Sequence, residues 1–224
     1  MGRLGDFLLA AAATALLLSG CSTFPGNRSL PTSNQIEQVL ETGRGLVGRG
    51  PLSKVQVNGR TFTLDCIGTV SAAWWGAGVD LQRDFGRYRG DGVNRLYESL
   101  NAWGALHWFR TPRPGDLIIW DHTWDTGDDP NFASGHTHAG LVMSVGADGT
   151  IAYLHESVTR GVVIAYINLY DPGTGLAPDG RVLNSPMFLG ARFGNPANPP
   201  LWTSGQLWSA FGDGSVVTRS LGGG

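Results

Sequence analysis

The amino-acid sequence predicts an α+β fold, with helices first and antiparallel strands after them. Apolar residues recur at helical spacing up to about residue 107, whereas short runs rich in β-branched and aromatic residues follow from about residue 116. The 34 glycines and 12 prolines among 224 residues indicate many turns, which disfavours a helical bundle. Strands that follow a run of helices are typical of an α+β domain.

Three helices are predicted before residue 108. The first covers residues 34–47, and Thr32 and Gln35 have the spacing of a capping box at its start. The second covers residues 66–75, where small and apolar residues predominate, so we expect it to be buried. The third covers residues 93–107, with its large apolar side chains on one side.

Five segments are predicted to be extended because β-branched and apolar residues predominate in them. They are residues 55–64, 116–120, 137–145, 151–155 and 162–169. The sequence Gly-Ala-Asp-Gly at 146–149 predicts a hairpin turn. If Val145 faces Thr150 across this turn, Gly140 faces His155 on the neighbouring strand.

The overall composition limits the classes of protein to consider. Hydrophobic residues make up 42% and charged residues 15%, which favours a packed core over disorder. The 16 basic and 18 acidic residues include no basic run, so no nucleic-acid partner is expected. The length suits one globular domain, predicted at residues 34–193, followed by a loop-rich tail at 194–224 that is rich in glycine, proline and asparagine near its start.

Residues 1–20 are predicted to be a signal peptide. Arg3 supplies a positive charge, and the apolar run at 7–18 is too short to span a bilayer. The sequence Leu-Ser-Gly-Cys that ends at Cys21 resembles the bacterial lipobox, which implies cleavage before Cys21 and acylation of it. Residues 21–33 would then tether the domain to a membrane, most simply the outer membrane on its periplasmic side. The alternative is an ordinary secretory signal that contains a cysteine.

Cys66 is the candidate nucleophile. If Cys21 is lipidated, Cys66 is the only thiol in a compartment that oxidises thiols. It follows an extended segment and begins a predicted helix, where backbone N–H groups and the helix dipole favour a thiolate and lower the thiol pKa. The thiolate is the attacking species, and neighbouring amides could hold a developing oxyanion. The alternative is an inert thiol in the core.

His138 is the candidate base, because it begins a predicted strand and Gly140 leaves space beside it. In the predicted register His155 faces Gly140, so it lies diagonally from His138 on the same face of the sheet. That separation allows a hydrogen bond that orients the His138 ring. A slip of one residue would place Glu156 on this face instead. His155 is therefore predicted as the third member of the site, with Glu156 as the alternative.

Four sequence motifs in this order resemble those of the NlpC-like and CHAP-type cell-wall hydrolases. They are Asp-Cys-x-Gly ending at Gly68, Pro-Gly-Asp-Leu from Pro114, His-Ala-Gly-Leu-Val from His138, and a hydrophobic strand ending at His155. The resemblance covers residues 35–169. It implies a papain-like core in which N-terminal helices pack on a small antiparallel sheet.

The resemblance also implies a function, namely cleavage of amide bonds in peptidoglycan peptides by a cysteine peptidase or amidase. Cys66 would be the nucleophile, His138 the base and His155 the residue that orients it. No cofactor is implied, and the expected partners are peptidoglycan and, through the lipid anchor, a membrane. The family usually has a small polar residue where this chain has Ile67. A catalytically inactive wall-binding lipoprotein is therefore kept as an alternative. A thiol-dependent acyltransferase is a further alternative, because some relatives of this fold perform acyl transfer.

Three further residues are candidates for substrate contact: Asp65, Trp120 and Trp124. The two tryptophans flank a loop that precedes His138, and Asp65 adjoins the nucleophile, although a role in local structure is the alternative for Asp65. No metal site is predicted, because the chain contains neither HExxH nor a CxxC pair. The protein is expected to be a monomer.

Overall fold

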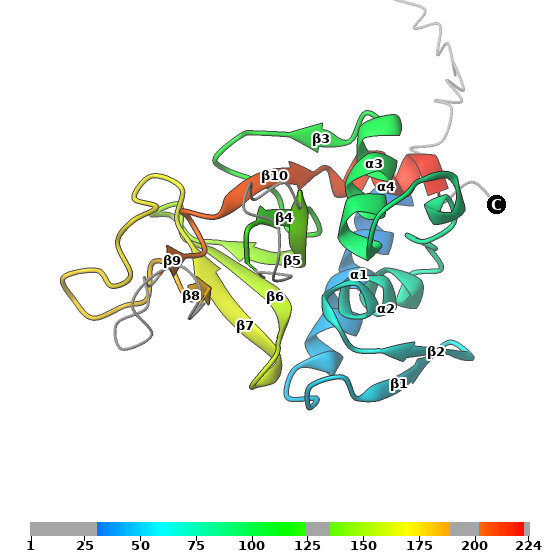
Figure 1. Cartoon of the computed structure of the whole chain (residues 1–224), viewed down its shortest axis with the longest axis horizontal. Coiled ribbons are helices and arrows are strands. Elements are labelled where there is room, and N and C mark those ends of the chain that lie inside the picture. Colours follow the sequence, from blue (N-terminus) through cyan, green and yellow to red (C-terminus); the bar gives the residue numbers. More distant parts are fainter. Residues whose placement is uncertain (1–30, 124–134, 189–201, 222–224) are drawn as a thin grey trace, which may run out of the picture.

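The structure, a computed structural model, describes residues 31–123, 135–188 and 202–221. The fold is α+β, as predicted, with helices and antiparallel sheets (Figure 1). The predicted signal peptide, the lipobox at Cys21 and Trp124 lie outside the described residues.

The helices pack together on one side of the molecule (Figure 1). They are α1 (Pro31–Leu46), α2 (Cys66–Gly76), α3 (Gly92–Ala102) and α4 (Gly214–Leu221), with a 3-10 turn at Phe85–Arg87. The third helix was predicted to reach residue 107, but it ends at Ala102 because Gly104 adopts a positive φ of 66° and turns the chain into a strand. None of the described helices is both long and apolar enough to cross a membrane.

A six-stranded antiparallel sheet forms the other layer. In spatial order its strands are β3 (Leu106–His107), β10 (Trp208–Gly212), β4 (Leu117–Asp121), β5 (His136–Val145), β6 (Ile151–Ser157) and β7 (Gly161–Ile167). The prediction of a loop-rich tail at 194–224 is wrong for residues 202–221. This segment supplies β10, which pairs with β3 and β4, as well as α4.

Two small hairpin-like sheets complete the fold. The segment predicted as one extended run at 55–64 is a hairpin of β1 (Lys54–Val57) and β2 (Arg60–Thr63). Asn58 and Gly59 form its turn with φ angles of 43° and 79°, the conformation that an Asn-Gly pair favours. The second small sheet pairs β8 (Pro186–Phe188) with β9 (Trp202–Thr203).

The large sheet buries apolar side chains on both of its faces. The helix-side cluster packs α1, α2 and α3 on one face through residues such as Trp74, Leu96 and Leu141, all with no exposed surface. The far-side cluster lies on the opposite face and includes Trp120 and Tyr153. Since the strands alternate between these two clusters, neighbouring residues of one strand belong to different environments.

The β5–β6 pairing differs from the prediction at the turn but agrees with it further along. Val145 faces Ile151 rather than Thr150, so the loop is one residue longer than expected. A β-bulge further along the pair compensates for this shift, and Leu141 faces Leu154 as the predicted register requires. Because the bulge restores the predicted register, the residues of β6 that lie beside the start of β5 are the predicted ones.

Candidate active site

Cys66 is the first residue of α2, and Asp65 caps this helix. The Asp65 carboxylate accepts a hydrogen bond from the Gly68 backbone N–H at 2.6 Å, a common N-cap arrangement. This engagement gives Asp65 a structural role at the helix start. Gly68 has no side chain at the point where the helix passes the carbonyl of Thr63, and a Cβ atom there would overlap that oxygen.

The Cys66 thiol is protonated at neutral pH. Its pKa is raised to about 12, mainly because burial disfavours the charged thiolate and also because the Asp65 and Glu156 carboxylates lie near it. The backbone N–H groups of Ala139 and Ile67 lie close enough to the sulfur to lower the pKa, but burial outweighs them. The prediction of a lowered thiol pKa at the helix start is therefore wrong.

This protonated thiol should react slowly with alkylating reagents. In a Cys21→Ser protein, where Cys66 is the only thiol, we expect iodoacetamide to modify Cys66 at pH 7 at least about a hundredfold more slowly than it modifies a small free thiol. The rate should keep rising beyond pH 9, and unfolding in urea should raise it to the free-thiol value. Rapid modification of the folded protein at pH 7 would contradict this description.

His138 and His155 are joined by a hydrogen bond between Nε2 of His138 and Nδ1 of His155, at 2.9 Å. Their rings meet edge to face with centroids 5.1 Å apart. His155 is 5% exposed, whereas His138 is partly buried at the start of β5. The structure thus brings together the two histidines that the predicted register placed as diagonal neighbours.

The Nδ1 atom of His138 makes no hydrogen bond within the described part of the chain. When Nε2 of His138 donates its proton to His155, Nδ1 carries a lone pair and can accept a proton. His155 Nε2 is buried without a partner among the described residues. This arrangement is that of a base whose ring is held by a second histidine.

Both imidazoles are neutral at pH 7. Burial lowers the pKa of His138 from its ordinary value of 6.5 to about 4. Burial, and next to it the neighbouring His138, holds the pKa of His155 well below the usual range. The site at rest therefore contains a neutral thiol and neutral imidazoles rather than a thiolate–imidazolium pair.

The neutral His138 makes folding stability depend on pH. The unfolded chain binds a proton at this residue near pH 6.5, but the folded chain binds it only near pH 4. The contribution of this residue to the free energy of unfolding is therefore complete above pH 6.5 and is lost as the pH falls toward 4. We expect the loss of unfolding free energy between pH 7 and pH 4.5 to be about 2 kcal/mol smaller in His138→Gln than in wild type. Urea titrations of both proteins at the two pH values measure this difference, and equal losses would contradict it.

Cys66 and His138 lie beside the same point of β5 but toward opposite faces of the large sheet, so the structure does not bring the predicted nucleophile and base together. The sulfur lies beside the backbone of Ala139, the residue that follows His138. Cys66 packs against the helix-side cluster, whereas the His138 ring contacts Trp120 of the far-side cluster, with ring centroids 5.7 Å apart. Among the described residues no hydrogen bond joins the sulfur to a ring nitrogen of His138.

Glu156 is a neighbour of the sulfur whose position the prediction missed. It was considered only as a substitute for His155, but alternation along β6 places it on the face toward α2. Its side chain is 5% exposed, and one carboxylate oxygen is buried without a partner among the described residues. Its pKa is raised, mainly by burial and also by Asp65. Because His155 and Glu156 are consecutive residues of one strand, their side chains point to opposite faces of the sheet, and this signal was present in the sequence.

Trp120 does not line a groove, which corrects the prediction of substrate contact. Its side chain has no exposed surface, and its indole N–H donates to the Ser204 carbonyl at 2.8 Å. The ring fills the space that Gly140 leaves open, since a Cβ atom at Gly140 would lie 3.0 Å from it. The space predicted beside His138 is therefore occupied by this tryptophan.

His136 belongs to a separate arrangement. Its Nδ1 is hydrogen-bonded to Asp121 at 2.7 Å, and its ring stacks on Tyr97 of α3 with centroids 3.6 Å apart. An irregularity in the β4–β5 register separates the pair Trp120–His138 from the pair Asp121–His136. Within residues 31–123, 135–188 and 202–221, no three histidine, cysteine or acidic side chains gather in a metal-binding arrangement.

Comparison with protein-family models, with curated proteins and with solved structures found no match. The fold and the site thus define the chain as an α+β protein in which a thiol at a helix start adjoins strand β5, whose His138 is hydrogen-bonded to His155 of β6.

Proposed function

We propose that this protein is a lipid-anchored cysteine hydrolase of the cell envelope, with a papain-like core, that cleaves amide bonds in peptidoglycan peptides. The observation that carries the proposal is the hydrogen bond between His138 and His155. It leaves Nδ1 of His138 as a free acceptor, one residue from the backbone that the Cys66 sulfur adjoins. A nucleophile, a base and a group that orients the base are the parts that thiol catalysis requires.

The proposed reaction begins when a substrate carbonyl docks beside Cys66. His138 Nδ1 takes the thiol proton as the sulfur attacks the carbonyl carbon, so the charged pair forms only during attack. Backbone N–H groups in the first turn of α2 lack intrahelical partners, and those of Cys66 and Ile67 are suited to hold the oxyanion. The protonated His138 then gives its proton to the leaving amine, and water hydrolyses the thioester.

The proposed reaction also requires the part of β5 that carries His138 to rearrange when substrate docks, because Sγ of Cys66 and the His138 ring lie toward opposite faces of the large sheet. Catalytic hydrogen bonds are often long in enzymes without substrate and tighten in the complex.

The proposed location follows from the amino-terminal sequence. The apolar run that ends at Cys21 resembles a lipoprotein signal, and acylation of Cys21 would place the domain on the outer membrane facing the periplasm. An anchor raises the effective concentration of the domain at a polymer that lies beside the membrane.

The direct test is digestion of purified peptidoglycan fragments by the wild-type protein, followed by identification of the products by mass. The expected products differ from the substrate by one added water and carry a new amino group and a new carboxyl group on wall peptides. Absence of such products, or cleavage of glycosidic bonds alone, would overturn the proposal.

A second candidate is a catalytically inactive protein that binds wall fragments. The raised pKa of Cys66 and the lack of a direct hydrogen bond to His138 favour it. This candidate predicts that fragments co-sediment with the protein while their masses stay unchanged after prolonged incubation. The same digestion experiment therefore separates the two candidates.

A further inference from the structure

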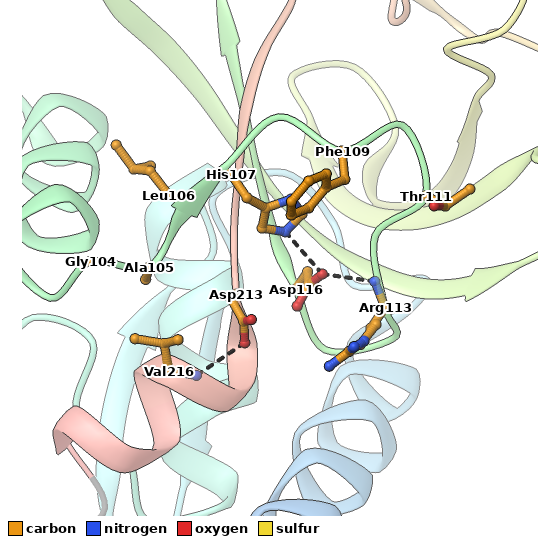
Figure 2. A pocket seen from close by; sticks show the side chains of 10 residues that line it. All are labelled: Gly104, Ala105, Leu106, His107, Phe109, Thr111, Arg113, Asp116, Asp213 and Val216. Atoms are coloured by element: carbon orange, nitrogen blue, oxygen red, sulfur yellow. Dashed lines mark hydrogen bonds and ion pairs between the residues drawn. The ribbon is translucent and has the colours of Figure 1, made fainter.

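A pocket lies at the β3 and β10 side of the sheet, away from Cys66. It has a volume of about 460 Å³, opens to solvent, and is lined by β3, the loop that follows β3, and the start of α4 (Figure 2). This volume is within the range of sites that hold small organic ligands. Ala105 and Val216 give the pocket an apolar wall, and His107, Asp116 and Asp213 give it a polar one.

An aromatic stack forms one edge of this pocket. The His107 ring stacks against both Phe109 and Phe211, with centroid distances of 5.4 Å to each and interplanar angles of 28° and 24°. Phe211 is fully buried, whereas Phe109 is 73% exposed. The neighbouring Trp108 is also 58% exposed. A rigidly supported aromatic ring in water presents a flat apolar surface that a ligand can cover.

The polar wall retains unused hydrogen-bonding capacity. Oδ1 of Asp213 accepts the backbone N–H groups of Ser215 and Val216 at the start of α4, while its other oxygen has no partner among the described residues. Nδ1 of His107 is buried and likewise unpaired within the described part of the chain. Nε2 of the same ring is 3.3 Å from Asp116, which fixes its orientation (Figure 2).

Arg113 adds a cation to the same pocket. Its guanidinium group has no carboxylate partner among the described residues, although Asp116 accepts its backbone N–H at 2.7 Å. The free oxygen of Asp213 and the guanidinium of Arg113 therefore both remain available to a ligand. The pocket thus offers an acceptor, a cationic donor and an exposed aromatic face.

We infer that this pocket binds a saccharide. A pyranose ring has an apolar C–H face that packs on an aromatic ring, and hydroxyl groups around its rim that both donate and accept hydrogen bonds. Phe109 supplies the stacking surface, the free oxygen of Asp213 accepts from a hydroxyl group, and Arg113 donates to one. The inference concerns binding and does not depend on catalysis by Cys66.

The position of the pocket suits a polymer that carries both sugars and peptides. Asp116 of the pocket immediately precedes β4, and Trp120 of β4 pairs with His138 of β5. At about 3.3 Å per residue, the two points are roughly 13 Å apart along the strand. A glycan held in the pocket would therefore keep an attached peptide within reach of the candidate active site.

The test is isothermal titration calorimetry of the mature chain with the trisaccharide of N-acetylglucosamine as the probe. Wild type is expected to bind it, and Phe109→Ala is expected to weaken binding about tenfold or more through loss of the stacking surface. Asp213→Asn should weaken binding by a similar factor, and since Asn is also a favoured N-cap residue, α4 keeps its cap.

Trp202→Ala is the matched control, since Trp202 is an aromatic residue on β9, 40% exposed and outside the pocket. This variant should bind the trisaccharide as wild type does. The inference is overturned if wild type shows no binding, or if Phe109→Ala and Asp213→Asn bind with wild-type affinity. Binding in a protein that digests no wall fragment would support the inference while the proposed hydrolase activity fails.

Discussion

Replacement of Cys66 by Ala is expected to lower the turnover of wall-peptide fragments by at least about a thousandfold while the protein remains folded. Cys66 carries the only thiol in the described part of the chain, and without it no thioester can form. The Ala side chain leaves the cap from Asp65 intact, because that cap binds the backbone of Gly68. Product release measured by chromatography, with circular dichroism to monitor folding, gives the comparison.

Histidine variants provide the matched control for this result. His138→Gln should lose activity to a similar extent, since it removes the ring that takes the thiol proton. His136→Gln should keep most of the activity, because His136 is hydrogen-bonded to Asp121 and not to His155. Unchanged turnover in Cys66→Ala, or equal losses in the two histidine variants, would exclude the proposed mechanism.

Replacement of Gly68 by Ala is expected to lower the free energy of unfolding by about 3 kcal/mol or more. The added methyl group would overlap the carbonyl oxygen of Thr63 and lie 3.2 Å from the capping carboxylate of Asp65. Both neighbours are held in place, one as backbone of β2 and the other as the helix cap, so the first turn of α2 must move. Urea unfolding measures the stability, and turnover should fall as well because Cys66 belongs to this turn.

Gly45→Ala is the control for the glycine substitution. Gly45 lies in α1, and a Cβ atom there meets nothing within 4 Å. Since alanine favours helix more than glycine by up to about 1 kcal/mol, this variant should be as stable as wild type or slightly more so. Equal unfolding midpoints for Gly68→Ala and wild type would show that α2 is not held against β2 in the way described.

Local sequence signals predicted the parts of the site that depend on neighbours in the chain. The start of α2 at Cys66 follows from the Asp65 cap and the small-residue run after it. The meeting of His138 and His155 follows from strand alternation and a short hairpin, although the turn itself was one residue longer than predicted. The bulge that compensates for this difference has no local sequence signal. The predicted position of the two histidines is therefore correct only because the longer turn and the bulge, neither of which was predicted, cancel each other.

Properties that arise from distant parts of the chain could not be predicted in this way. The thiol pKa depends on how deeply α2, β5 and β6 bury Cys66 together, and this burial reverses the effect of the helix start. The burial of Trp120 depends on Gly140 in the next strand and on the Ser204 carbonyl. The strand β10 was missed because its apolar run is short and its partners, β3 and β4, are about a hundred residues earlier in the sequence.

The place of β10 within the large sheet also bears on when the chain can fold. This strand is late in the sequence, yet it lies between β3 and β4, so β3 has no neighbour in the sheet and β4 has one unpaired edge until residues 208–212 are present. A nascent chain that lacks this strand leaves two edges unpaired and Phe211's site in the far-side cluster unfilled. The large sheet therefore gains its full set of six strands only after residues 208–212 have been synthesised.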